Sequence, residues 1–410
     1  MKRLLAASFA VVLLLAAFPV AAPRTLPAAG VQGLNAFLSG QVSRGAVPGV
    51  VAVVVNRSQV LYSGAFGKQN TAKDVPLAAD SIFRIASMTK AVTSVATMMM
   101  VEQGKLKLDD DVSTYLPAFK SMTVLTKYDE QAGTYETRPL TKVITIRQLL
   151  THTSGIGYSW SDPGLALVQR KTNKGGETDL PLVHEPGEKW TYGASTKVLG
   201  DIVEKLSGER IDAFTKRHIT DPLAMKDTFY EVPRASYARV VTTHQKDAAG
   251  KIGETQNPET IPVSLRGDGG LLSTAPDYGR FLQMLLNGGE LGGTRILKAS
   301  TVADMLKPHT NGVRVRPQPT ANPSLSKPYP LGAGEDSWGL GFQLADPKRA
   351  DPNMRRPGSG NWAGIFNTFF WIDPKEELGV VVMMQMLPFY DEAAIDTLRG
   401  VEQRIYQNLK

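Results

Sequence analysis

Two side chains that could act together as a nucleophile and a base lie three residues apart, at Ser87 and Lys90 in the stretch IASMTKAV. The following residues, 91–104, place apolar side chains on one helical face and end at Gly104, which predicts a helix beginning near Ser87. Residues three apart on a helix are neighbours, and a helix N-terminus favours developing negative charge. Because an adjacent amine can activate a serine hydroxyl, we expect Ser87 to be a nucleophile and Lys90 its proton partner.

The S-x-x-K pattern by itself is weak evidence. A chain of this length is expected to contain it about once or twice by chance, and a second copy does occur at Ser324 and Lys327. That copy lies in a proline-rich stretch without a helical pattern and is typical of a loop. The assignment of Ser87 as a nucleophile therefore depends on the residues that surround the first copy of the pattern.

Composition narrows the class of protein. With 410 residues the chain exceeds the usual size of a single core, so we expect two subdomains. Hydrophobic residues make up 42% and charged residues 21%, which is ordinary for a folded protein, and the net charge of +7 is scattered rather than gathered into a nucleic-acid-binding arm. The absence of cysteine excludes disulfides, thiol nucleophiles and thiolate metal sites. The five histidines are dispersed, so neither a metal site nor a cofactor is expected.

The N-terminal residues predict export. Lys2 and Arg3 precede an apolar run over 4–18 and then small residues, the order found in secretory signal peptides. We expect residues 1–22 to be a signal peptide, with cleavage after Ala22 or as late as Ala29, and the mature protein to be periplasmic or secreted without a stable membrane span. An uncleaved membrane anchor is the alternative.

The coarse element pattern predicts an α+β fold. A helix is expected over 31–45, strands over 49–56 and 59–67, further strands over 338–344, 367–373 and 378–386, and a terminal helix over 391–409. Residues 107–330 alternate helical patterns and loops with no convincingly strand-rich segment. These features predict an antiparallel sheet built from both chain ends (30–106 and 331–410) and flanked by helices, with an inserted mainly helical domain over 107–330.

A series of blocks in the chain carries a family resemblance. The blocks SMTK, LDDDVSTYLPAF, TIRQLLTHTSGI, EPGEKWTYGASTKVLGDIVEKLSG, GDGGLLSTAPDYGRFLQMLLNGG and WGLGFQL occur in this order. Together they resemble the class C β-lactamase-like branch of the serine β-lactamases and penicillin-binding proteins, across most of residues 35–408. The chain is most similar to the family VIII carboxylesterases. The resemblance implies the β-lactamase/penicillin-binding-protein-like fold and Ser87 as the acylated serine.

The second motif of this branch is Y-x-N, and here it reads Tyr192-Gly193-Ala194. The tyrosine is kept and the asparagine is lost, as in family VIII esterases. The resemblance implies that Tyr192 transfers protons with Lys90, either as a phenolate or as a hydrogen-bonded relay.

The third motif is K-T-G in β-lactamases, and here the matching triplet is Trp362-Ala363-Gly364. Family VIII esterases similarly have W-x-G. Replacing a lysine by an indole favours neutral acyl esters over anionic β-lactams. Gly364 is expected to let a substrate carbonyl approach the strand, so that the backbone N–H groups of Ser87 and Ile365 cradle the oxyanion.

Further candidate pocket residues are aromatic. Tyr158, Trp160, Trp338 and Phe366 could line an acyl pocket, whereas His152 is expected to have a structural hydrogen-bonding role and residues 267–273 to form a backbone turn beside the site. The chain also lacks the G-x-S-x-G pattern of many Ser-His-Asp hydrolases.

The function predicted from these motifs is an exported serine carboxylesterase acting on a small ester or acyl substrate, with Ser87, Lys90 and Tyr192 catalytic. The alternatives are a β-lactamase, D-amino-acid peptidase or acyltransferase of the same fold, and a non-catalytic penicillin- or peptidoglycan-binding relative.

Overall fold

The computed structural model describes residues 24–173, 175–247, 249–256, 261–348 and 351–410. The predicted signal peptide, residues 1–22, lies outside these ranges. The first helix, α1 (Ala28–Ser43), begins shortly after the predicted signal peptide, so a cleavage site as late as Ala29 would fall inside the first turn of α1.

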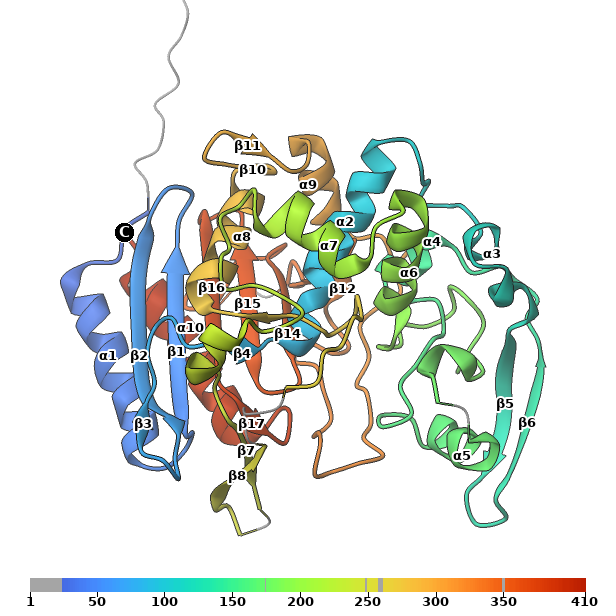
Figure 1. Ribbon diagram of the computed structural model, residues 1–410, viewed down its shortest axis with the longest axis horizontal. Coiled ribbons are helices and arrows are strands. Elements are labelled where there is room, and N and C mark those ends of the chain that lie inside the picture. The colour runs from blue at the N-terminus through green and yellow to red at the C-terminus, as the bar shows by residue number, and fades with distance from the viewer. Residues whose placement is uncertain (1–23, 174, 248, 257–260, 349–350) are drawn as a thin grey trace, which may run out of the picture.

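An eight-stranded antiparallel sheet forms the centre of the molecule (Figure 1). Its spatial order is β12 (Ser337–Trp338), β13 (Gln343–Leu344), β14 (Gly360–Gly364), β15 (Thr368–Asp373), β16 (Leu378–Met383), β1 (Gly49–Val55), β2 (Val60–Asn70) and β3 (Val75–Pro76). The N-terminal strand β1 pairs with the C-terminal strand β16, with Val53 opposite Val381. The two ends of the chain therefore build one sheet, as the sequence predicts, and both strands at this junction are fully buried.

Helices cover both faces of the sheet. Consecutive residues of a strand point to opposite faces. Phe370 packs against Tyr278 of α8 (Ala275–Leu286), whereas the indole of Trp371 donates a hydrogen bond to Tyr406 of α10 (Glu392–Asn408). Helix α1 packs beside α10, where Gly400 leaves room for the ring of Phe37. The sheet is thus sandwiched between α1 and α10 on one face and α8 on the other.

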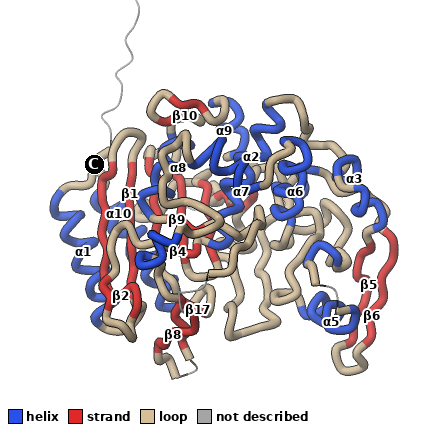
Figure 2. Tube along the Cα trace, viewed as in Figure 1, coloured by secondary structure: helices blue, strands red, loops and turns tan. Residues whose placement is uncertain are grey.

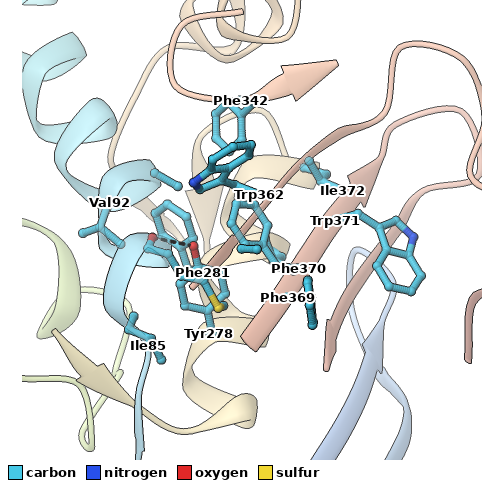
Figure 3. Close-up of a cluster of buried hydrophobic side chains, with 14 of the residues drawn as sticks. Ile85, Val92, Tyr278, Phe281, Phe342, Trp362, Phe369, Phe370, Trp371 and Ile372 are labelled. Atoms are coloured by element: carbon cyan, nitrogen blue, oxygen red, sulfur yellow. Dashed lines mark hydrogen bonds between the residues drawn. The ribbon is translucent and has the colours of Figure 1, made fainter. Parts of the chain in front are cut away.

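The helix that carries Lys90, α2 (Thr89–Glu102), lies beyond α8 and is almost entirely buried. Figure 3 shows the core in this region, where Ile85 and Val92 face Tyr278 and Phe281 of α8 and the aromatic residues of β14 and β15. The Tyr278 hydroxyl donates to the carbonyl of Met88 at 2.9 Å. This hydrogen bond and the surrounding apolar contacts fix the start of α2 against the sheet.

The insertion contains the helices α3 (Val112–Tyr115), α4 (Ile146–Leu150), α5 (Pro163–Thr172), α6 (Ser195–Ser207), α7 (Ile211–Thr215) and α9 (Ala299–Met305). Short 3₁₀ turns occur at Ala86–Met88, Pro117–Ser121, Glu177–Asp179 and Arg234–Arg239, and a π-helical turn at Lys216–Thr220. The rest of the strands are β4 (Phe83–Arg84) with β9 (Leu272–Ser273), β10 (Glu290–Leu291) with β11 (Thr294–Arg295), β5 (Thr123–Asp129) with β6 (Thr134–Pro139), and β17 (Met386–Leu387) with β7 (Thr243–Lys246) and β8 (Ile252–Gln256).

The expectation that residues 107–330 lack strand-rich segments is wrong. The hairpin β5–β6 projects from the insertion, as the red strands in Figure 2 show. Most of its side chains are exposed on both faces, so it lacks the alternation of apolar and polar residues that reveals a strand in a sequence. Its turn is closed by the Asp129 carboxylate, which accepts hydrogen bonds from the backbone N–H groups of Gln131 and Ala132.

Two further differences concern boundaries. Helix α8 lies within the range assigned to the insertion but packs on the sheet, with Gly379 of β16 against Leu282. The strand expected over 338–344 is reduced to β12 and β13, two residues each. Over the parts of the chain that the structure describes, no helix is both long and apolar enough to cross a bilayer.

Candidate active site

Ser87 lies in the 3₁₀ turn that leads into α2. The residue before it, Ala86, has a φ of 44°, a left-handed conformation that costs a non-glycine residue free energy. The turn is held by the hydrogen bond from Tyr278 to Met88. Such strain persists only where the surroundings enforce it, and here it presents Ser87 at the N-terminal end of a long buried helix.

Lys90 is buried directly beside the serine. Its Nζ lies 3.1 Å from Ser87 Oγ, 3.0 Å from Tyr158 Oη and 2.7 Å from the backbone carbonyl oxygen of Asp268. Burial lowers the pKa of Lys90 to about 7, with the Asp268 carboxylate acting against this shift and Arg266 adding to it. A lysine with this pKa is a neutral amine in part of the molecules at neutral pH and can accept a proton.

Tyr192, from the loop before α6, completes the group. Its hydroxyl accepts a hydrogen bond from Trp362 Nε1 at 3.0 Å, and the Ser87 side chain is near enough to lower the pKa of Tyr192. Its ring centroid is 4.8 Å from Lys90 Nζ. Residues from positions 87, 90 and 192 are therefore brought into one cluster by the packing of α2 against α6.

Burial raises the pKa of Tyr192 well above 10, although the hydrogen bonds from Ser87 and Trp362 act in the opposite direction. Of the two forms considered from the sequence, the resting state is therefore the protonated phenol and not the phenolate. Lys90, with its pKa near 7, is the group prepared to accept the first proton.

The strand β14 forms the wall opposite Ser87, but Gly364 is needed for a reason other than substrate access. A Cβ there would overlap with the carbonyl oxygen of Ile85 and with Thr368 Oγ1. The glycine thus allows the strand to approach the turn before Ser87, and Ile365, the next residue, lines the same pocket as Ser87. The two backbone N–H groups predicted to form the oxyanion hole belong to these two residues.

The pocket at Ser87 has a volume of about 160 Å³. Its lining includes the aromatic side chains of Tyr158, Trp160, Tyr192 and Phe389, together with Ala363 and Arg266. Tyr158 therefore contributes to the pocket as expected for a substrate-binding residue, but its hydroxyl also contacts Lys90.

Three of the residues expected to line the pocket do not. Trp362 lies behind Tyr192 and holds its hydroxyl. Trp338 is fully buried behind Trp362, with ring centroids 4.7 Å apart, and donates its indole N–H to Leu150. Phe366 is half-buried and is not among the residues that line the cavity. The indoles at 338 and 362 therefore support the site from behind, whereas Ala363 and Ile365 line the cavity.

Asp268 and Arg266 are two functional candidates that the sequence motifs do not predict. Residues 267–273 were expected to supply only a backbone turn, and the carbonyl of Asp268 does contact Lys90. The Asp268 carboxylate, however, also accepts a hydrogen bond from Tyr158 Oη at 2.7 Å and pairs with Arg266. A charged residue between two glycines in a buried turn was the available signal.

The hydrogen-bonding role expected of His152 is not found within the described residues, because its Nδ1 is buried without a hydrogen-bond partner. Its ring packs between Tyr192 and Trp338, with centroids 4.9 and 5.1 Å away. Burial, assisted by the charge of Lys90, lowers its pKa well below 6.5, so the ring is neutral. Within the described ranges, no cluster of three or more histidine, aspartate or glutamate side chains is arranged to hold a metal ion.

A protein-family model described as beta-lactamase matches residues 34–403. The chain belongs to the β-lactamase family. The match spans both the sheet and the insertion, and it agrees with the α+β fold that the sequence predicts, an antiparallel sheet with flanking helices. The predicted membership of the β-lactamase-like serine hydrolase superfamily is confirmed.

Relatives of this β-lactamase-family protein include enzymes that make and cleave esters. The monacolin J acid methylbutanoyltransferase of Aspergillus terreus is 30% identical over 389 residues, which cover 88% of this chain and 92% of that protein. The lovastatin esterase of Penicillium rubens is 28% identical over 400 residues, covering 89% and 96%. A solved structure of the simvastatin synthase LovD of Aspergillus terreus, the LovD6 mutant, superimposes with a TM-score of 0.80 at 27% identity, covering 93% of this chain and 98% of that one.

Proposed function

We propose that this protein is an exported serine esterase that cleaves small carboxylic esters through an acyl-enzyme on Ser87. The observation that best supports the proposal is the cluster of Ser87, Lys90 and Tyr192, in which Ser87 and Tyr192 line one pocket and the pKa of Lys90 is lowered to about 7. Family membership supports the same class of chemistry.

In the acylation step, neutral Lys90 accepts the proton of Ser87 while Ser87 Oγ attacks the ester carbonyl carbon. The developing oxyanion is stabilised by the backbone N–H groups of Ser87 and Ile365, each of which typically contributes a factor of about 10²–10³ in rate. The carbon–oxygen bond to the alcohol then breaks. Tyr192, which is a phenol at rest, donates its proton to the leaving alkoxide, and the alcohol departs.

In the deacylation step, the Tyr192 phenolate accepts a proton from water while the water oxygen attacks the acyl carbon. The phenolate is short-lived and is stabilised by the protonated Lys90 beside it. Lys90 then returns its proton to Ser87 Oγ as the carboxylic acid leaves. The cycle consumes one ester and one water and restores all three side chains.

The pocket favours neutral substrates over anionic β-lactams. The K-T-G lysine is replaced by Trp362, which points behind Tyr192, and the guanidinium of Arg266 is already paired with Asp268. The aromatic walls contributed by Trp160 and Phe389 suit an apolar acyl group.

Acyl transfer is a second candidate function, favoured by similarity to an acyltransferase over most of both chains. The same acyl-enzyme would then react with an alcohol instead of water, and Tyr192 would deprotonate that alcohol. The two functions differ only in whether water or an alcohol accepts the acyl group from Ser87.

Hydrolysis of nitrophenyl butyrate by the mature protein tests the proposal. We expect a burst of nitrophenol and a loss of about 10⁴-fold or more in kcat for Ser87→Ala, because the remaining groups have no nucleophile to activate. Ser324→Ala, in the second S-x-x-K copy, is the matched control and should retain the full rate. Full activity of Ser87→Ala would refute the mechanism.

Three further assays distinguish the proposed esterase from the alternative functions. A titration with small alcohols shows whether the acyl-enzyme partitions to transfer, and nitrocefin reports β-lactamase activity. A folded protein that a fluorophosphonate fails to label at Ser87 would indicate a binding protein. Export is proposed from residues 1–22 alone, and N-terminal sequencing of the protein recovered outside the cytoplasm tests it.

A further inference from the structure

The hydrogen bonds around Lys90 leave its nitrogen little freedom. Two of its three neighbours, Tyr158 Oη and the carbonyl oxygen of Asp268, are 3.0 and 2.7 Å away, and the third is Ser87 Oγ. A carbonyl oxygen can only accept a hydrogen bond. The direction of the contact with Tyr158 depends on where the hydroxyl hydrogen of Tyr158 points.

That hydrogen is directed at Asp268. Tyr158 Oη donates to the Asp268 carboxylate at 2.7 Å, and a carboxylate has no hydrogen to give in return. Burial, followed by the negative charge of Asp268, raises the pKa of Tyr158 well above 10, so the hydroxyl keeps its hydrogen. Tyr158 can therefore offer Lys90 only an oxygen lone pair.

The consequence is a fixed orientation for the neutral amine. A neutral lysine has two N–H groups and one lone pair. If the two N–H groups point to Tyr158 and to the Asp268 carbonyl, the lone pair is left facing Ser87 Oγ, where a base must accept the proton.

Asp268 is held ionised for this role. Burial would raise its pKa, but Lys90 and Arg266, together with the hydrogen bonds from Arg266 and Tyr158, lower the pKa below its usual value. Arg266 donates from Nε at 3.0 Å and from Nη2 at 2.9 Å to the two carboxylate oxygens. The Asp268 side chain is almost completely buried, so this carboxylate does not serve as a surface ion pair.

The charged and titratable groups that face Lys90 come from four segments. Asp268 and Arg266 come from the turn before β9, Tyr158 from the loop before α5, Tyr192 from the loop before α6, and His152 from the loop after α4. Tyr158, Tyr192 and His152 are neutral at rest. The Asp268 carboxylate is therefore the only negative charge among these described neighbours of Lys90.

We propose that Asp268 is a positioning residue that, through Tyr158, aims the lone pair of Lys90 at Ser87. This inference rests on the proposed function, because it concerns the activation of Ser87. Asp268 lines the same pocket as Ser87, but its hydrogen bonds in the described structure go to Lys90, Tyr158 and Arg266 and not to the serine, so in this role it acts through the hydroxyl of Tyr158 and through its own backbone carbonyl.

Asp268→Asn gives a specific expectation. In this variant Arg266 would donate its hydrogen bonds to the amide oxygen, and the amide NH₂ would donate to Tyr158 Oη. The hydroxyl hydrogen of Tyr158 would then be free to form a hydrogen bond with the lone pair of Lys90. The plateau of kcat/KM for nitrophenyl butyrate should fall about 10²-fold, the usual effect of misplacing a catalytic group. Loss of the negative charge should also lower the Lys90 pKa, so the acidic limb of the pH profile should move to lower pH.

Glu402→Gln is the matched control. Glu402 forms a similarly buried two-contact pair with Arg355, at 2.6 and 3.0 Å, on α10 at the other face of the sheet. It should lose thermal stability while its acidic limb remains at the pH of the wild type. A shift of that limb in both variants would assign the effect to general destabilisation and overturn the inference.

Tyr158→Phe supplies a second, independent variant that keeps the Asp268–Arg266 pair. The plateau should fall to a similar extent, and the double variant should lose little more than either single one, because the two residues act as one unit. Additive losses would overturn the inference, as would an Asp268→Asn plateau within twofold of the wild type.

The rate of fluorophosphonate labelling of Ser87 is followed across the same pH range in every variant. If the wild-type protein turns over no ester but is labelled, the proposed function fails and the labelling profiles still test the role of Asp268. If the wild type hydrolyses esters and Asp268→Asn shows an unmoved acidic limb, only this inference fails. A wild-type protein that is neither labelled nor active overturns both.

Discussion

The residues of the site divide into those proposed to react and those that hold them in place. Ser87 and Lys90 are adjacent because three positions on a helix bring side chains together, but Tyr192 reaches them from a separate loop. Its hydroxyl is oriented by the indole N–H of Trp362. This tryptophan stands at the position of the K-T-G lysine, and it donates a hydrogen bond to Tyr192 instead of lining the pocket.

Trp362→Phe should lower kcat by about two- to tenfold with little change in KM. It removes one hydrogen bond to Tyr192, and such a bond contributes about 0.5–1.5 kcal/mol, where 1.4 kcal/mol corresponds to a factor of ten. Steady-state kinetics with nitrophenyl butyrate measure the effect.

Trp371→Phe is the control for this change. It removes a comparable indole hydrogen bond, to Tyr406 at 3.2 Å, on the opposite face of the sheet. It should reduce stability and leave kcat unchanged. Equal kinetic losses in both variants would contradict the role given to Trp362.

At the scale of elements, the site depends on the distance between β14 and the turn that starts α2. β14 pairs with β13 only at Gly360 and Asn361, so this strand pairing ends before the residues that line the pocket. Gly364 then lets the strand meet the carbonyl of Ile85. The absence of a side chain at Gly364 thus allows the strand and the turn to pack closely.

Gly364→Ala should separate these two elements. The added methyl group would overlap with Ile85 and Thr368, and overpacking of this kind typically costs about 1–3 kcal/mol. We expect both a lower unfolding free energy and slower fluorophosphonate labelling of Ser87, because Ile365 would move away from the oxyanion position.

Gly253→Ala provides the comparison, since Gly253 lies in strand β8 with no atom within 4 Å of the new methyl group. Its labelling rate should equal that of the wild type. Unchanged labelling of Gly364→Ala, measured on folded protein, would show that the close approach is unnecessary.

At the scale of the whole molecule, the fold closes by joining its two ends. β1 and β16 pair near the centre of the sheet, and α1 packs beside α10 (Figure 1), neither of which contributes a residue to the pocket lining. Packing at this junction should therefore affect the free energy of unfolding but not the rate of ester hydrolysis.

Leu38→Ala in α1 tests this separation. Leu38 is fully buried, and truncating a buried leucine usually costs about 2–5 kcal/mol. We expect a lower midpoint of thermal unfolding, with kcat/KM unchanged at temperatures where circular dichroism shows the variant folded. The exposed Gln32→Ala on the same helix should change stability by no more than about 0.5 kcal/mol. A loss of activity in folded Leu38→Ala would contradict the separation.

Much of this organisation could be predicted from the sequence. The valine-rich strands at both ends, the buried helix after Ser87 and the terminal helix have strong apolar patterns, and each is present in the structure. The hairpin β5–β6 could not be predicted in this way because its exposed polar strands have no such pattern. The hydrogen bond from Trp362 to Tyr192 could not be predicted, because the sequence of the Trp362-Ala363-Gly364 triplet does not specify the direction of the indole ring.

The sequence by itself determined that Ser87 and Lys90 are neighbours, since helical geometry fixes the distance between residues three apart. It also determined the family-level arrangement of motifs along the chain. Only the tertiary structure decided which groups surround Lys90, because Tyr158, Tyr192 and Asp268 come from segments far apart in the chain and meet through packing. It also decided the protonation of the site, since burial, which lowers the pKa of Lys90 to about 7 and keeps Tyr192 a phenol, is a property of the folded molecule and not of any stretch of sequence.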